Sequence, residues 1–151
     1  MFQPLAGKRV IETTQVLAGP YCTYQLALMG AEVIKIEKPG QGDWTRQGGQ
    51  DPELKAAGLP LSFLTQNAGK KSVTIDLKTE KGLAILKDLV KDSDVFIENF
   101  RPGTAAKLGI AYEDLAPLNE RLVYASLSAY GQDGPIGHRP AYDHICLLYT
   151  S

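Results

Sequence analysis

The sequence predicts an α/β fold with a Rossmann-like, open, mostly parallel sheet and flanking helices. Short β-branched segments alternate with segments of helical periodicity along the chain. The segments expected as strands are apolar on both faces, which is typical of parallel sheets covered by helices. Near the N-terminus, strand, helix and strand follow one another within about 30 residues, as in a βαβ unit. We expect strands at residues 10–12, 31–37, 72–77, 94–98 and 122–127, and helices at 21–29, 80–91, 104–108 and 112–118.

The predicted boundaries depend on residues with known positional preferences. Pro20 suits the first turn of a helix, where its missing N–H costs nothing, and Gly30 suits the residue after a helix end. Thr79 is a candidate N-cap for the helix at 80–91. The Gly- and Pro-rich stretch 38–60 is expected to be a long loop, and 128–139 another; such loops are usually functional or mobile.

Composition narrows the class of protein before any motif is considered. The chain has 151 residues, of which 44% are apolar and 22% charged, as in a single globular domain rather than a disordered chain. The net charge of −1 argues against bulk binding of nucleic acid or membrane. Two cysteines offer no disulfide framework, and the N-terminus lacks the pattern of a secretory signal. We therefore expect a cytoplasmic protein.

The topology predicts where a ligand binds. In open parallel sheets, ligands bind beyond the carboxyl ends of the strands. Four of these ends lead into 16–19, 37–40, 98–101 and 128–131. The first opens a helix, whose free N–H groups favour an anion, although a plain turn is an equally good interpretation.

Basic residues near these ends could bind a phosphate, and each also has a simpler interpretation. Lys38 follows Glu37 at a strand end and could be a solvated charge. Lys70 and Lys71 follow Gly69 and could meet a diphosphate, although most such lysine pairs are only solvated surface. Arg101, next to Phe100, could grip a phosphate or simply belong to a rigid turn.

Several other chemistries lack their motifs. The sequence has no GxGxxG fingerprint, no Walker pattern and no GxSxG elbow. His138 and His144 are the only histidines, and their surroundings do not make a zinc site, so we expect no metal. A catalytic role for His144 beside Asp143 is disfavoured, because adjacent residues on a strand face opposite ways.

Taken together, an ordered series of short segments resembles the N-terminal third of the family III CoA-transferases, the group with formyl-CoA transferase and L-carnitine CoA-transferase. The resemblance runs from Pro4 to about Ile145. It rests on the residues LAGP at 17–20, GAEVIKIEKP at 30–39, GDWTR at 42–46, NAGKKS at 67–72, DLK at 76–78, DVFIENFRPG at 94–103 and YGQDGP at 130–135.

The resemblance implies a site for coenzyme A or an acyl-CoA substrate. It places the chain in the N-terminal part of the family's large domain, with no catalytic residue among these 151. In the family's transferases an aspartate carboxylate attacks the acyl-CoA, giving a mixed anhydride and then an enzyme-bound CoA thioester. The resemblance implies that this aspartate lies beyond position 151, that a carboxylic acid accepts the CoA, and that the whole protein is an interlocked homodimer. The residues implied to contact CoA are Val16, Leu17, Ala18, Lys38, Asn67, Ala68, Gly69, Lys70, Asn99, Phe100, Arg101, Lys107, Ser128, Ala129, Tyr130 and Gly131.

One position separates the transferases from the α-methylacyl-CoA racemases, which belong to the same family. The resemblance places Ala141-Tyr142-Asp143 of this chain where the racemases have Gly-His-Asp. Tyr142 replaces their acid–base histidine, and a phenol, with a pKa of about 10, is a poor base at neutral pH. A racemase-like enzyme remains the alternative, followed by an NAD(P)-binding oxidoreductase domain and a non-catalytic binding module.

The last residues do not resemble the family. Codons that spell the end of a transposase-based sequencing adaptor encode Cys146 to Ser151, so 146–151 is expected to be translated adaptor and 1–145 the truncated domain. A natural apolar helix start is the alternative. We expect the 151-residue chain to be inactive and, with apolar surface uncovered, to aggregate.

Overall fold

The fold is built on a five-stranded sheet in which every pairing is parallel. The computed structural model describes residues 2–139 and 141. The strand order is β3-β2-β1-β4-β5, so the order reverses between β1 and β4. This confirms the predicted fold class. The strands are β1 (Arg9–Glu12), β2 (Glu32–Glu37), β3 (Lys71–Thr74), β4 (Val95–Glu98) and β5 (Val123–Ser126).

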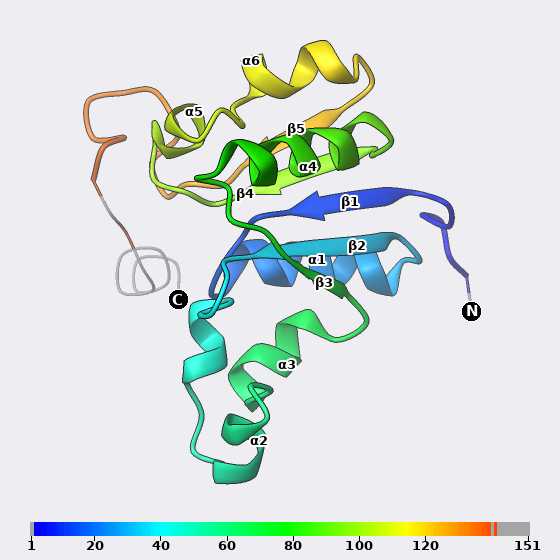
Figure 1. Cartoon of the computed structure of the whole chain (residues 1–151), viewed down its shortest axis with the longest axis vertical. Coiled ribbons are helices and arrows are strands. Elements are labelled where there is room, and N and C mark those ends of the chain that lie inside the picture. Colours follow the sequence, from blue (N-terminus) through cyan, green and yellow to red (C-terminus); the bar gives the residue numbers. More distant parts are fainter. Residues whose placement is uncertain (1, 140, 142–151) are drawn as a thin grey trace.

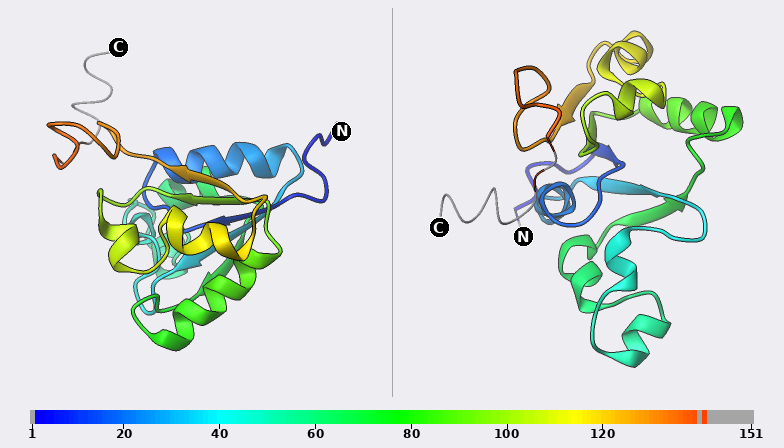
Figure 2. Two further views of the ribbon diagram at one scale, coloured as in Figure 1. Left: turned by 90° about the horizontal axis from the view of Figure 1, so that it is seen from above. Right: turned by 90° about the vertical axis from the view of Figure 1, so that its left-hand side faces the viewer.

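Helices cover both faces of the sheet (Figures 1 and 2). On one face α1 (Ala18–Leu28) packs against Val10, Val33 and Ile97. The opposite face packs Ile11, Ile34 and Phe96 against the remaining long helix and the segments that follow it. Successive strand residues thus enter different cores, which explains why the strands are apolar on both sides. The second layer contains α4 (Glu80–Lys91), α5 (Thr104–Lys107), α6 (Tyr112–Leu115) and the 3₁₀ turn η2 (Ala116–Leu118).

The helix α4 has the predicted bounds and the predicted cap. The Thr79 hydroxyl accepts a hydrogen bond from the Gly82 N–H at 3.0 Å. Leu86 and Val90, one turn apart, are both fully buried. The cap and the apolar spacing together fix this helix.

The segment between β2 and β3 differs from the prediction. The expected loop 38–60 contains the 3₁₀ turn η1 (Trp44–Gln47) and the helix α2 (Pro52–Ala56), and the unpredicted α3 (Leu61–Asn67) follows it. Together they form an arm beside the β2 and β3 edge of the sheet (Figure 1). The third strand ends at Thr74, because the Asp76 carbonyl turns to accept the Thr79 N–H and hydroxyl. Within the described residues no helix is long and apolar enough to cross a membrane.

Candidate functional site

The turn between β1 and α1 is held in a strained conformation. Val16 has φ +71°, which is a genuine outlier for a β-branched side chain. The Asn99 side chain binds the backbone of Gln15, the residue before Val16, through two hydrogen bonds. The Asn99 side-chain oxygen accepts the Gln15 N–H at 2.9 Å, and the Asn99 side-chain amide donates to the Gln15 carbonyl at 2.8 Å. Asn99 follows β4, so the two strands on either side of the reversal are tied together where they end.

The turn after β4 is organised by a buried carboxylate. Glu98 is 3% exposed and accepts the Phe100 N–H at 2.7 Å and the Ser126 hydroxyl at the end of β5. Gln132 donates in turn to the Ser126 hydroxyl at 2.6 Å. Glu98 therefore links the β4 turn with the end of β5, while Arg101 stays exposed.

A cavity of about 780 Å³ lies where these turns meet. It sits beyond the carboxyl ends of β1, β4 and β5, at the reversal of strand order, as expected for this topology. Its volume is within the range of small-molecule and cofactor sites. Half of the residues predicted to contact CoA line it: Val16, Leu17, Ala18, Asn99, Phe100, Arg101, Ser128 and Ala129.

Other residues lining the cavity were missed by the sequence analysis. Trp44 comes from η1 and is 63% exposed, and Arg139 comes from the loop after β5. Trp44 lies in the segment 42–46, and the resemblance of that segment, rather than any periodicity, was the signal that could have identified it. Arg139 had no such signal, because nothing in the spacing shows that its loop returns to the cavity. The remaining members are Gln15, Pro102, Ser126, Leu127, Gly137 and Ala141.

Lys70 lies outside this cavity. Its side chain is only 2% exposed, and Nζ lies 2.8 Å from the Glu12 carboxylate. It also donates to the Pro20 carbonyl, the Thr23 hydroxyl and the Asn67 side chain at 2.7–2.9 Å. Burial lowers the pKa of Lys70, and the adjacent Glu12 opposes that change. These contacts tie the loop before β3 to the start of α1 and leave no hydrogen of Nζ for a phosphate.

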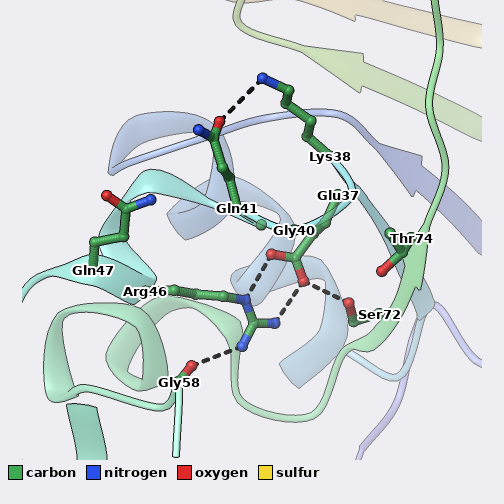
Figure 3. A pocket seen from close by; sticks show the side chains of 10 residues that line it. Glu37, Lys38, Gly40, Gln41, Arg46, Gln47, Gly58, Ser72 and Thr74 are labelled. Atoms are coloured by element: carbon green, nitrogen blue, oxygen red, sulfur yellow. Dashed lines mark hydrogen bonds and ion pairs between the residues drawn. The ribbon is translucent and has the colours of Figure 1, made fainter. Parts of the chain in front are cut away.

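Lys38 also lies elsewhere, at the rim of a second cavity of about 440 Å³ (Figure 3). Its ammonium group donates to Gln41 at 3.0 Å. Beneath it, the Glu37 carboxylate accepts from Arg46 Nε at 2.7 Å and from Ser72. Burial raises the pKa of Glu37, but the hydrogen bonds from Arg46, Ser72 and the Asp43 N–H outweigh it and hold the pKa at about 2. Glu37 is thus held inside the protein.

The other predicted contacts are not brought to the main cavity. Asn67 is buried, and its amide donates to the Phe63 carbonyl at the end of α3. Lys107 is exposed on α5. No cluster of three or more potential metal ligands occurs in residues 2–139 and 141. Ala68, Gly69, Tyr130 and Gly131 do not line the main cavity, and Tyr142, Asp143, His144 and the segment 146–151 lie outside the described residues.

Comparisons with known proteins agree with this architecture. The family model for CoA-transferase family III matches residues 5–151. The chain belongs to CoA-transferase family III.

The curated relatives are CoA-transferases. The chain is 43% identical to succinyl-CoA:glutarate CoA-transferase of Mus musculus over 95% of its length, and that match covers 32% of the mouse protein. It is 49% identical to acetyl-CoA:oxalate CoA-transferase of Acetobacter aceti, over 94% of this chain and 36% of that protein. The chain spans about a third of the length of these relatives.

Solved structures share the fold closely. Rv3272 from Mycobacterium tuberculosis superposes with a TM-score of 0.86 at 46% identity, covering 95% of this chain and 39% of that one. A CAIB/BAIF family protein from Brucella suis gives a TM-score of 0.86 at 40% identity, covering 95% and 38%.

Proposed function

We propose that the 780 Å³ cavity binds coenzyme A for a CoA-transferase that moves CoA from an acyl-CoA thioester to a carboxylic acid. The observation that carries this proposal is the convergence of the Val16, Phe100 and Ser128 turns on one cavity at the reversal of strand order. The family membership supplies the class of ligand.

The cavity wall has suitable chemistry for such a ligand. Phe100 and Trp44 offer aromatic faces to an adenine ring or to an apolar arm. The guanidinium groups of Arg101 and Arg139 suit phosphate oxygens. We therefore propose these four residues, with the 16–18 turn, as the CoA-binding set. Contacts of CoA with Lys38 and Lys107 stay predictions, and a contact with Lys70 would have to replace one of its present hydrogen bonds.

The chemistry we propose is covalent catalysis by an aspartate outside the 151 residues. Its carboxylate attacks the thioester carbonyl and releases the CoA thiolate, which then attacks the resulting anhydride to give an enzyme thioester and the donor acid. The acceptor acid takes over the CoA by the reverse steps. The sequence favours transfer over racemisation, because Tyr142 stands where the racemases have histidine.

The proposed binding is tested by calorimetry of the chain with CoA and with pantetheine. Arg101→Ala should raise the Kd for CoA about tenfold and leave the Kd for pantetheine unchanged, because only CoA carries the nucleotide phosphates. Arg121→Ala, an exposed arginine just before β5, is the matched control. Binding of NADH without binding of CoA would overturn the proposal in favour of an oxidoreductase domain.

The activity is tested on the protein from the complete reading frame, with a panel of acyl-CoA donors and acids. We further propose that this protein acts in the cytoplasm as an interlocked homodimer and that the 151-residue chain alone is inactive. Light scattering of both products, alongside the transfer assay, tests the assembly. Transfer activity in the 151-residue chain itself would contradict an external aspartate.

A further inference from the structure

A buried lysine on an inner strand of the sheet does not line the cavity, but it contacts residues that shape the cavity. Lys35, on β2, is 1% exposed. Its ammonium group donates to the Thr14 carbonyl at 2.7 Å. It lies 2.9 Å from the Asp43 carboxylate and 3.9 Å from the Glu12 carboxylate. The contact with Asp43 Oδ2 lacks hydrogen-bond geometry, so it is an ion pair.

Two of the three partners of Lys35, Thr14 and Asp43, lie next to residues of the cavity wall. Thr14 stands two residues before the strained Val16, whose N–H donates to Asp43 Oδ1 at 3.4 Å. Asp43 is also the N-cap of η1, since the same oxygen accepts the Thr45 N–H at 2.9 Å. Trp44 is the first residue of η1. The Lys35–Asp43 pair therefore joins the Val16 turn to the Trp44 wall.

Stability alone does not account for this arrangement. Removing charges from water is costly, and a buried ion pair replaced by apolar residues of similar volume often leaves a protein equally stable. A close ion pair excluded from water does hold the groups it joins near each other, here at 2.9 Å. A positive φ at a β-branched residue likewise persists only where its surroundings hold it in place.

We propose that Lys35 is a positioning residue that holds the Val16 turn and the Trp44 wall in the arrangement that receives the ligand. This inference rests on the proposed function for the identity of the ligand, CoA. The positioning itself does not depend on that function, because it concerns two walls of the unliganded protein.

The test uses the double variant Lys35→Met/Asp43→Asn in the 151-residue chain. The cluster of Lys35, Lys70, Glu12 and Asp43 has no net charge, and the double variant preserves that balance. Asparagine can still cap η1 through its oxygen. The matched control is Lys8→Met/Asp94→Asn, which removes a lysine–aspartate pair of 2.8 Å whose lysine is 57% exposed.

Two measurements follow. Trp44 is the single tryptophan, so time-resolved fluorescence anisotropy of the unliganded chain reports on this wall alone. The double variant should unfold cooperatively, show a larger amplitude of fast Trp44 motion and bind CoA about ten- to a hundredfold more weakly. The control pair should match the parent in both.

Two outcomes overturn the proposal. Unchanged Trp44 motion with unchanged CoA affinity would show that the pair positions nothing. Loss of cooperative unfolding in the double variant would assign Lys35 to stability instead. If the parent does not bind CoA, the proposed function fails, while the anisotropy still decides whether Lys35 positions Trp44.

Discussion

Glu37 keeps its negative charge inside the protein because donors surround its carboxylate. Its pKa of about 2 lies below the ordinary value of 4.5, so the folded state holds the proton more weakly than the unfolded state. The resulting stability is fully present above about pH 4.5 and is lost as the pH falls toward 2. The shift corresponds to about 3 kcal/mol of unfolding free energy.

We expect Glu37→Gln to lower the unfolding free energy at pH 6. The difference in unfolding free energy between this variant and the parent should become smaller as the pH falls. Urea unfolding of both proteins between pH 6 and pH 3 measures the narrowing difference. Arg46→Met is the companion variant: it removes the largest hydrogen-bonding cause of the lowered Glu37 pKa, which brings the folded-state pKa closer to the unfolded value, so acid should cost that protein less stability than it costs the parent. Parallel acid profiles for the parent and Glu37→Gln would contradict this assignment.

Lys70 should behave as a structural residue when it is replaced. Lys70→Met leaves the buried Glu12 carboxylate without its partner at 2.8 Å, and uncompensated buried charges typically cost about 3–5 kcal/mol. Lys71→Met next to it should cost under about 1 kcal/mol, because its pair with Glu32 is largely exposed. Chemical denaturation of the two variants measures the contrast. If both variants lost an equal and small amount of unfolding free energy, Lys70 would be a solvated surface lysine, as its sequence context suggested.

These residues show which part of the site could be predicted. The turns at 16–18, 99–101 and 128–129 were predictable, because the topology alone brings strand ends to one edge. The inward direction of Lys70 was not, because its partner Glu12 stands 58 positions away. Trp44 reaches the cavity from η1, in the stretch between β2 and β3. The sequence of that stretch has no regular apolar spacing from which its path could be predicted.

At the scale of elements, local signals decide which predictions succeed. The bounds of α4 were predictable because a side-chain cap and a regular apolar spacing agree. The helix α3 begins at Leu61, with Pro60 at the N-cap position and no side-chain cap, and it spans only seven residues, so its sequence resembles the loop around it. Its position depends instead on contacts with α1 and η1.

Gly82 in the first turn of α4 should resist a replacement that normally stabilises helices. Replacing glycine by alanine in a helix interior normally stabilises the helix by about 1 kcal/mol. A Cβ at position 82 would lie 2.0 Å from the Asp76 carbonyl oxygen, which accepts the Thr79 hydroxyl. We therefore expect Gly82→Ala to lower stability by about 1–3 kcal/mol.

Thermal unfolding measures this effect against a matched change in the same helix. Ala84→Gly, at an exposed position of α4, should cost about 1 kcal/mol through propensity alone. Gly82→Ala and Ala84→Gly are opposite exchanges in the same helix, and we expect both to lower the stability of the protein. A higher melting temperature for Gly82→Ala would show that Asp76 moves aside freely.

At the scale of the whole molecule, the two edges of the sheet differ in chemistry. At one edge β3 carries Lys71, which is 68% exposed, and such charges discourage pairing with another chain. At the other edge β5 pairs with β4 alone among the described strands. It presents Val123, which is 61% exposed, and no charged residue.

An unprotected apolar edge predicts that copies of the 151-residue chain associate through β5. Val123→Lys should raise the dissociation constant of this association about tenfold or more, because like charges would face each other across the new pairing and about 1.4 kcal/mol suffices for that change. Ile85→Lys is the control, since Ile85 is 52% exposed and belongs to a helix, α4, rather than to a strand of the sheet. Sedimentation velocity across a range of concentrations measures all three proteins. A parent protein that is monomeric at every concentration would contradict association. If both lysine substitutions raised the dissociation constant equally, the effect would be one of general solubility rather than of the β5 edge, because only pairing between strands makes position 123 special.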